Sequence, residues 1–322
     1  MVMMHTPVLL LIFNRPDKVR EQMACLRRQQ PASLFVAADG PRPDRPGETL
    51  QCESARQAVL SAIDWPCSVQ TLFRSHNLGC GKAVSSAVNW FFEHNEEGVV
   101  LEDDCLPDPT FFSFCTAMLQ HYRHDPAVMH INGSNFQFGR QRGTASYYYS
   151  RFAHVWGWAS WRRAWQQYDF TLQRYLGMSA EGLSPTLKHD MKAVYHQQLD
   201  TWDVQWFLSV WFNQGWTITP NVSLVRNTGY GNGATHTLHE PGWFRKINYG
   251  QLPVITYPEE RRIDEAADRY AAEVMYSPSR FYTTMRDMIK GSPTLLRLYQ
   301  RLMLKDNTAA SKNIKISKYQ NR

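Results

Sequence analysis

The sequence has no apolar run long enough to cross a membrane. The run from Val8 to Phe13 is far shorter than the roughly 20 residues that span a bilayer. No basic leader precedes it and no small-residue cleavage site follows it, so it is not typical of a signal peptide. We therefore expect a cytoplasmic protein.

Closely spaced cysteine pairs are absent from the sequence as well. The six cysteines form no CxxC pair and no spacing typical of zinc ligands. They are therefore interpreted as reduced thiols of a cytoplasmic protein, and no structural zinc site is expected. They are Cys25, Cys52, Cys67, Cys80, Cys105 and Cys115.

The body of the chain carries no excess of charge. The net charge is +6, but residues 296–322 hold seven basic residues and a single acidic one, Asp306, and that difference accounts for all of it. A formally neutral body gives no support for a nucleic-acid-binding surface. We expect no nucleic-acid partner.

Strand and helix signals alternate in the first third of the chain. With 43% hydrophobic and 20% charged residues, the 322-residue chain can bury a sizeable core. The alternation favours a doubly wound α/β fold with a mostly parallel sheet, in which ligands bind at the carboxyl ends of strands. The predicted strands are 7–13, 33–40, 68–75 and 97–104, and the predicted helices are 16–28 and 82–94.

The middle of the chain changes character. Residues 147–165 are dense in aromatic side chains, residues 196–215 have the pattern of a helix, and residues 216–237 read as a strand leading into a glycine-rich loop. We expect a single Rossmann-like domain over residues 1–290, with a mixed, mostly parallel sheet flanked by helices.

A helical appendage is predicted for residues 291–322. From Thr294, the segment TLLRLYQRLMLK places basic residues at i, i+4 spacing beside leucines. A basic amphipathic helix of this kind can lie on the anionic inner face of a membrane, as a peripheral contact, or dock on the protein itself.

The segment GVVLEDDCLPDP ends a buried-looking strand in three acids, Glu102, Asp103 and Asp104. Like charges repel, so a cation is expected beside them. In an extended strand Glu102 and Asp104 would share one face, with Asp103 on the other, and two carboxylates suit a hard divalent cation. The alternatives are a solvated strand end or a helix cap, although Asp108 and Pro109 fit the cap better.

Further candidates follow the other strands. Arg15 in the segment NRP can bind a phosphate, with Asn14 beside it, yet NRP is also a plausible turn. Lys82 in GCGK is a candidate for phosphate contact, although the phosphate-loop pattern fails because His76 occupies the place of its first glycine. Trp156 and Trp158 can stack on sugar rings or lie in the core, and we expect them to be divided between the two roles.

The order ADG, VVLEDDCLPDPTFFSF, WGW, TWDVQW and GYGNGATH resembles the GT-A-fold glycosyltransferases over roughly residues 6–240. It is most similar to the N-acetylglucosaminyltransferase I type and to bacterial nucleotide-diphospho-sugar transferases described as hemolysin-like. The resemblance implies a GT-A-like fold and metal-dependent transfer, with inversion, from a nucleotide-sugar donor such as a UDP-sugar to a glycan or glycolipid acceptor.

The resemblance also implies roles for individual residues. Asp104 would ligate Mn²⁺ or Mg²⁺, with Glu102 and Asp103 holding sugar, ribose or metal-bound water. Asp39 and Gly40 would contact the nucleotide, where the alternative is an Asp-Gly-Pro turn. The remaining assignments are Asp203 as the base, with Asp200 as a rival, Trp158 in the donor pocket, and His236 on the metal or diphosphate, with His239 as its neighbour.

Two other functions remain open at this point. A sugar-nucleotide pyrophosphorylase shares the general fold and the need for a metal, but the glycine- and base-rich loop that it requires near the first strand is not visible in FNRPDK. A non-catalytic carbohydrate-binding protein on the same fold would bind a glycan without releasing a nucleotide.

Overall fold

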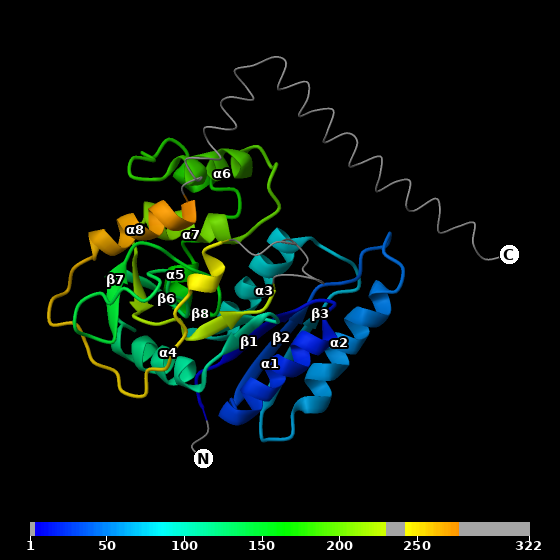
Figure 1. Cartoon of the computed structure of the whole chain (residues 1–322). Helices are drawn as coiled ribbons and strands as arrows, with labels where there is room; N and C mark the ends of the chain where they lie inside the picture. The colour runs from blue at the N-terminus through cyan, green and yellow to red at the C-terminus, as the bar shows by residue number, and fades with distance from the viewer. Residues whose placement is uncertain (1–3, 230–241, 277–322) are drawn as a thin grey trace. The chain divides into compact units, whose positions relative to one another are not determined.

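The predicted strands of the first third form the parallel half of one sheet, as the computed structural model in Figure 1 shows. The structure describes residues 4–229 and 242–276. The strand order in this half is β3-β2-β1-β4. Its strands are β1 (Val8–Ile12), β2 (Ser33–Ala38), β3 (Ser68–Phe73) and β4 (Glu97–Glu102), joined by α1 (Pro16–Gln29), α2 (Glu48–Ala62) and α3 (Cys80–His94).

The aromatic middle of the chain completes this sheet. Strand β8 pairs antiparallel with β4 and with β6, and the full order is β3-β2-β1-β4-β8-β6-β9-β7. The added strands are β6 (Val128–Asn132), β7 (Tyr147–Ser150), β8 (Trp158–Trp161) and β9 (Trp216–Pro220). A second, two-stranded sheet pairs β5 (Cys105–Pro107) with β10 (Val225–Asn227). The predicted α/β class with a mixed, mostly parallel sheet is therefore confirmed.

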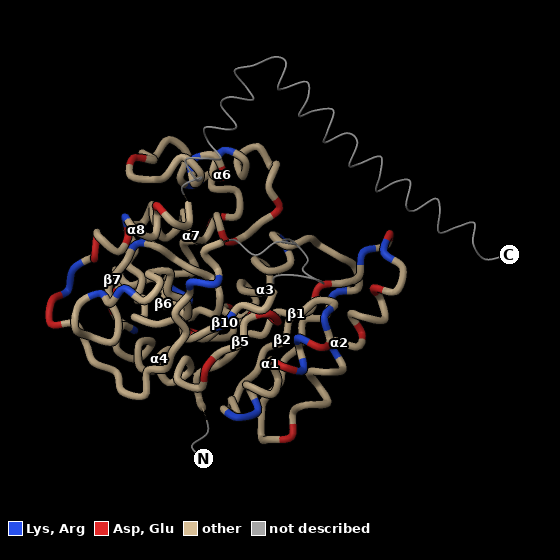
Figure 2. The backbone as a smooth tube through the Cα atoms, viewed as in Figure 1, with Lys and Arg blue, Asp and Glu red and all other residues tan. Residues whose placement is uncertain are grey.

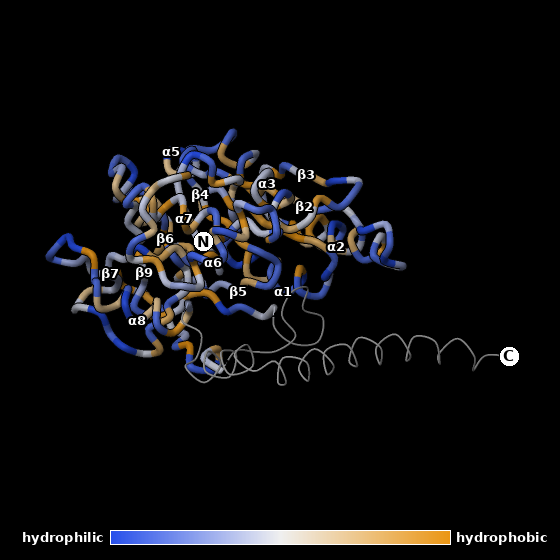
Figure 3. The backbone as a smooth tube through the Cα atoms, turned by 90° about the horizontal axis from the view of Figure 1, so that it is seen from above, coloured by the Kyte–Doolittle hydropathy of each residue, from blue (hydrophilic) through white to orange (hydrophobic). Residues whose placement is uncertain are grey.

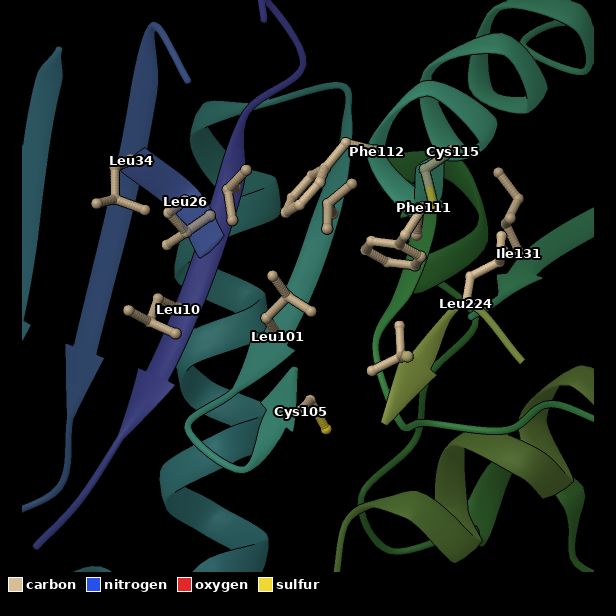
Figure 4. Packing of buried hydrophobic residues seen from close by; sticks show 14 of the residues in the cluster. Leu10, Leu26, Leu34, Leu101, Cys105, Phe111, Phe112, Cys115, Ile131 and Leu224 are labelled. Atoms are coloured by element: carbon tan, nitrogen blue, oxygen red, sulfur yellow. The ribbon is translucent and has the colours of Figure 1, made fainter. Parts of the chain in front are cut away.

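Helices cover both faces of the large sheet. Side chains of β1 alternate, so Val8, Leu10 and Ile12 pack with α1 and α2 on one face, while Leu9 and Leu11 pack with α3 on the other. Figure 4 shows the first of these cores, and Figure 3 shows hydrophobic segments gathered at the sheet. The remaining helices are α4 (Pro109–His121), α5 (Arg162–Trp165), α6 (Pro185–Tyr195), α7 (Asp203–Phe212) and α8 (Glu265–Tyr276), with 3₁₀ turns at Gln173–Tyr175 and Phe244–Lys246.

Two local predictions have different outcomes. Asp108 caps α4 as expected, because its Oδ1 accepts a hydrogen bond from the Thr110 amide at 2.9 Å and Pro109 is the first helical residue. The helix predicted over residues 196–215 is shorter, since α7 begins only at Asp203 and residues 196–202 form its approach.

The carboxyl-terminal predictions cannot be compared with the fold. The boundary at residue 290 and the basic helix from Thr294 both lie outside the described residues. In the part of the chain that the structure describes, no helix has the length and apolar character needed to cross a membrane.

Helix α8 docks on β7 through Asp268. Its carboxylate accepts hydrogen bonds from the Ser150 hydroxyl and, at 3.0 Å, from the Arg151 amide. Burial raises the pKa of Asp268 to about 6, against the opposing effect of these donors. The folded protein therefore keeps this proton at a pH where the unfolded chain has lost it.

We predict that Asp268 makes folding stability fall as pH rises from about 4 to 6. Below pH 4 both states are protonated, and above pH 6 the folded state bears a buried charge, so the contribution is lost across this window. Relative to Asp268→Asn, the wild-type unfolding free energy should decline by about 2 kcal/mol in chemical denaturation. The control Glu273→Gln, at an exposed position of α8, should show the same pH dependence of the unfolding free energy as wild type. An unchanged difference across the window would contradict the prediction.

Candidate active site

A cavity of about 660 Å³ lies at the carboxyl ends of the parallel strands, the edge predicted from the sequence. In Figure 2 acidic and basic residues lie close together near β1 and β10. Among the described residues, six carboxyl groups line the cavity against three guanidinium groups, so acidic residues are in excess in this part of the wall. These residues are Asp39, Glu102, Asp103, Asp104, Asp200 and Asp203, with Arg15, Arg42 and Arg74.

Arg15 is the cation that the acid triplet requires. Its Nη2 lies 3.1 Å from Asp104 Oδ2 and also forms an ion pair with Asp103. Both aspartates reach Arg15 because β4 ends at Glu102 and residues 103 and 104 form a turn. The expectation that Asp103 and Asp104 would point to opposite faces is therefore wrong.

Asp103 has a structural role in this arrangement. It is only 2% exposed, it pairs with Arg15, and its Oδ2 lies 3.4 Å from the Phe13 amide. Burial raises its pKa to about 6, although the Arg15 charge opposes this shift. Asp103 therefore ties the end of β4 to the end of β1.

Glu102 differs from its neighbours because its side chain accepts no hydrogen bond from a described residue. It lines the cavity directly. Burial, together with the charges of Asp104, Asp103 and Asp203, raises its pKa well above the ordinary range. A carboxylate held in these surroundings would be stabilised by a cation.

Asp104 lies against the start of the glycine-rich segment. Its carbonyl accepts a hydrogen bond from the Thr228 amide at 2.7 Å. A Cβ at Gly229 would overlap the Asp104 carboxylate, so glycine lets the chain pass this close. His236 and His239, predicted for this segment, lie outside the described residues.

The two aspartates near α7 have separate roles. Asp203 is the first residue of α7 and lines the cavity, and the Thr201 hydroxyl donates to its carboxylate. Asp200 instead accepts hydrogen bonds from the amides of Cys80 at 3.0 Å and Gly81 at 2.9 Å, at the amino terminus of α3. Asp200 therefore caps α3, which leaves Asp203 as the candidate base.

Asp39 lines the cavity, but it is also a loop anchor. Its carboxylate accepts hydrogen bonds from the amides of Gly40 and Leu78 and from the Asn77 side chain, at 2.9 to 3.1 Å. Burial raises its pKa despite these donors. A Cβ at Gly40 would overlap the backbone of His76, so Gly40 permits the two loops to pack rather than facing the cavity.

Three other predicted site residues do not line the cavity. Asn14 donates a hydrogen bond to Glu48 at 2.9 Å, and Lys82 is exposed on the first turn of α3. Trp158 is fully buried between the rings of His130 and Trp202. Trp156, by contrast, lines the cavity. Trp158 therefore lies in the core and not in the donor pocket that the resemblance implied for it.

Arg42 and Arg74 line the cavity but were not predicted as site residues from the sequence. Arg42 follows β2 and is held by Glu48, whose carboxylate lies 3.0 to 3.1 Å from Arg42 Nε. Its guanidinium carbon lies 5.4 Å from the centre of the Phe13 ring. Arg74 directly follows β3 and donates to the Ser86 hydroxyl at 2.7 Å. Their position just after strand ends was the available signal.

The described residues contain no group of three or more His, Cys, Asp or Glu side chains arranged to hold a metal ion. A complete protein cage is not required for Mg²⁺ at nucleotide sites, because one or two carboxylates and the substrate phosphates suffice. Glu102 and Asp104 each present one carboxylate to the cavity.

No protein-family model matches this chain, and no curated protein matches it. Among solved structures, the chain is similar to UDP-glucose pyrophosphorylase complexed with UDP-glucose, with a TM-score of 0.36 and 8% identity. The similarity covers 66% of this chain and 90% of that one. A likeness this distant does not indicate a function for this chain.

We predict that Arg15→Gln destabilises the fold by about 2 to 3 kcal/mol. The change leaves the buried Asp103 carboxylate without its cation, which is costly even though Arg15 is partly exposed. Urea denaturation at pH 7 measures the effect. The control Arg20→Gln removes an exposed pair with Asp17 and should change stability by less than about 0.5 kcal/mol. Equal effects of the two variants would show that the Asp103 pair is not a structural requirement.

Proposed function

We propose that the protein is a metal-dependent glycosyltransferase that moves a sugar from a nucleoside diphosphate donor, most simply a UDP-sugar, to a glycan or glycolipid acceptor. The observation that carries this proposal is the carboxylate-rich cavity, in which Glu102 forms no salt bridge with a described residue. A diphosphate would be repelled by this wall unless a divalent cation entered with it.

Glu102 and Asp104 would hold the ion, Mn²⁺ or Mg²⁺. Both line the cavity at the end of a rigid strand, and oxygen ligands suit these hard cations. The ion supplies Lewis-acid stabilisation of the charge that develops on the departing diphosphate. Arg15, beside Asp104, adds a fixed positive charge on the same side.

The nucleoside would lie toward the ends of β2 and β3. Phe13, Arg42 and Arg74 line the cavity there and offer one ring face and two guanidinium groups. Uracil presents two carbonyl acceptors, which guanidinium donors can satisfy. Asp39 would act mainly by holding the Asn77–Leu78 loop in place, because its carboxylate already accepts three donors.

Asp203 would act as the general base. As the acceptor hydroxyl oxygen bonds to the anomeric carbon, the bond from that carbon to the β-phosphate oxygen breaks, and the hydroxyl proton passes to the Asp203 carboxylate. The nucleoside diphosphate leaves with the bonding electrons. Direct displacement of this kind inverts the configuration at the anomeric carbon.

The pyrophosphorylase alternative is less well supported. Helix α1 begins at Pro16, only three residues after β1 ends, which leaves no room for a long phosphate-binding loop there. The carbohydrate-binding alternative shares the cavity but predicts no nucleotide release.

We predict manganese-dependent release of nucleoside diphosphate when purified protein is given a panel of nucleotide sugars. Asp104→Asn and Glu102→Gln should each reduce the rate roughly a hundredfold or more, because each removes a ligand charge from the ion. The control Asp17→Asn, at an exposed site on α1, should match wild type. Release that persists after chelation, or in Asp104→Asn, would reject the metal assignment.

We further predict that Asp203→Asn lowers transfer roughly 10²- to 10⁴-fold while leaving UDP affinity within about twofold. An amide cannot take the acceptor proton, but it retains the shape of the carboxylate. Single-turnover transfer and calorimetric UDP titration measure the two quantities. Loss of UDP binding together with a lowered melting temperature would instead identify Asp203 as a stabiliser of the α7 terminus.

A further inference from the structure

An aromatic wall adjoins the cavity through Trp156, beyond the acid triplet. It consists of Phe136, Trp156, Trp243 and Phe244, and Trp156 lines the cavity itself. The Trp156 and Trp243 rings stack at 6.0 Å with 28° between their planes. Such a surface next to a strongly charged cavity is suited to binding a ligand that has an apolar face.

Gly157 fixes Trp156 in this position. Its φ is +63°, a conformation suited to glycine, and a Cβ there would come within 2.7 Å of a Val225 methyl group. The Gly157 carbonyl accepts a hydrogen bond from the Gly133 amide at 2.8 Å. Because of this backbone turn, the Trp158 side chain lies in the core and the Trp156 side chain lies at the cavity.

Phe136 supports the wall from behind. It is 3% exposed, and its ring meets Trp156 edge-on at 5.2 Å and Trp243 edge-on at 5.6 Å. The two tryptophans are only partly buried. The buried Phe136 ring therefore holds the Trp156 ring in place, which limits the entropy lost when a ligand stacks on Trp156.

The strand order shows where this wall lies relative to the proposed nucleoside site. From β3 to β8 the cavity edge runs through Arg74 and Arg42, then the acids that follow β4, and then Trp156, which precedes β8. Trp158 pairs with Val100, so β8 starts at the carboxyl end of β4. Trp156 therefore lies beyond the acids, on the side opposite the proposed nucleoside site.

We propose that Trp156, supported by Phe136 and Trp243, is the stacking face for an uncharged pyranose of the acceptor saccharide. The C–H face of a pyranose packs on an indole, while its hydroxyl edge remains free for polar groups. The excess of carboxylates in the cavity disfavours acidic saccharides such as uronic acids. This inference rests on the proposed transferase function and specifies its acceptor.

The test is calorimetric titration of the full-length protein, saturated with UDP and Mn²⁺, with methyl glycosides and disaccharides. The panel contains neutral hexosides, N-acetylhexosaminides and a glucuronide. We expect at least one neutral saccharide to bind, the glucuronide to bind at least about tenfold more weakly, and Trp156→Leu to weaken neutral binding about tenfold. Trp156→Phe, which keeps an aromatic face, should restore most of the affinity.

The control is Trp90→Leu, which alters a half-buried tryptophan on α3 that contacts Phe35 and does not line the cavity. It should bind saccharide as wild type does, and UDP affinity should be unchanged in all variants. If no saccharide binds wild type, or Trp156→Leu binds as tightly as wild type, the stacking proposal is wrong. Failure of UDP binding in wild type would instead reject the proposed function.

Discussion

The pairing of Arg15 with Asp103 and Asp104 is the interaction on which the candidate site depends. Three consecutive acids at the end of a buried strand would repel one another, and Asp103 is almost completely buried. Arg15, just after the neighbouring strand, compensates two of the charges, and the turn at residues 103 and 104 brings both aspartates within reach of it. The parallel pairing of β1 with β4 brings these groups together, so the sheet topology itself permits the acidic cavity.

Carboxylates also build the edges of the cavity. Asp39 holds the loop after β3, and Asp200 holds the amino terminus of α3, each by accepting backbone N–H groups. Both bonds join segments far apart in the sequence, 39 and 120 residues respectively. Their charges are therefore used in shaping the wall, which leaves Glu102, Asp104 and Asp203 as the candidates for the proposed chemistry.

The sequence predicted the parts of this site that follow from local pattern. Hydrophobic runs located the four parallel strands, and their carboxyl ends located Arg15, Asp39 and the acid triplet. The roles of the other site residues depend on tertiary contacts, which the sequence pattern does not reveal. No local signal distinguishes Asp200 from Asp203, since only the distant amides of α3 assign the first as a cap. Trp156 and Trp158 were likewise separable only through the backbone turn at Gly157.

The charge balance of the cavity constrains the proposed chemistry further. Among the described residues, the proposed ligands of a lone divalent ion are Glu102 and Asp104. Asp104 is already paired with Arg15, so the ion would bind weakly without additional oxygen ligands. A lone diphosphate would meet an excess of carboxylates. Each ligand supplies what the other lacks, because the phosphates complete the coordination shell and the ion cancels the repulsion. By thermodynamic reciprocity, each must then raise the affinity of the other by the same factor.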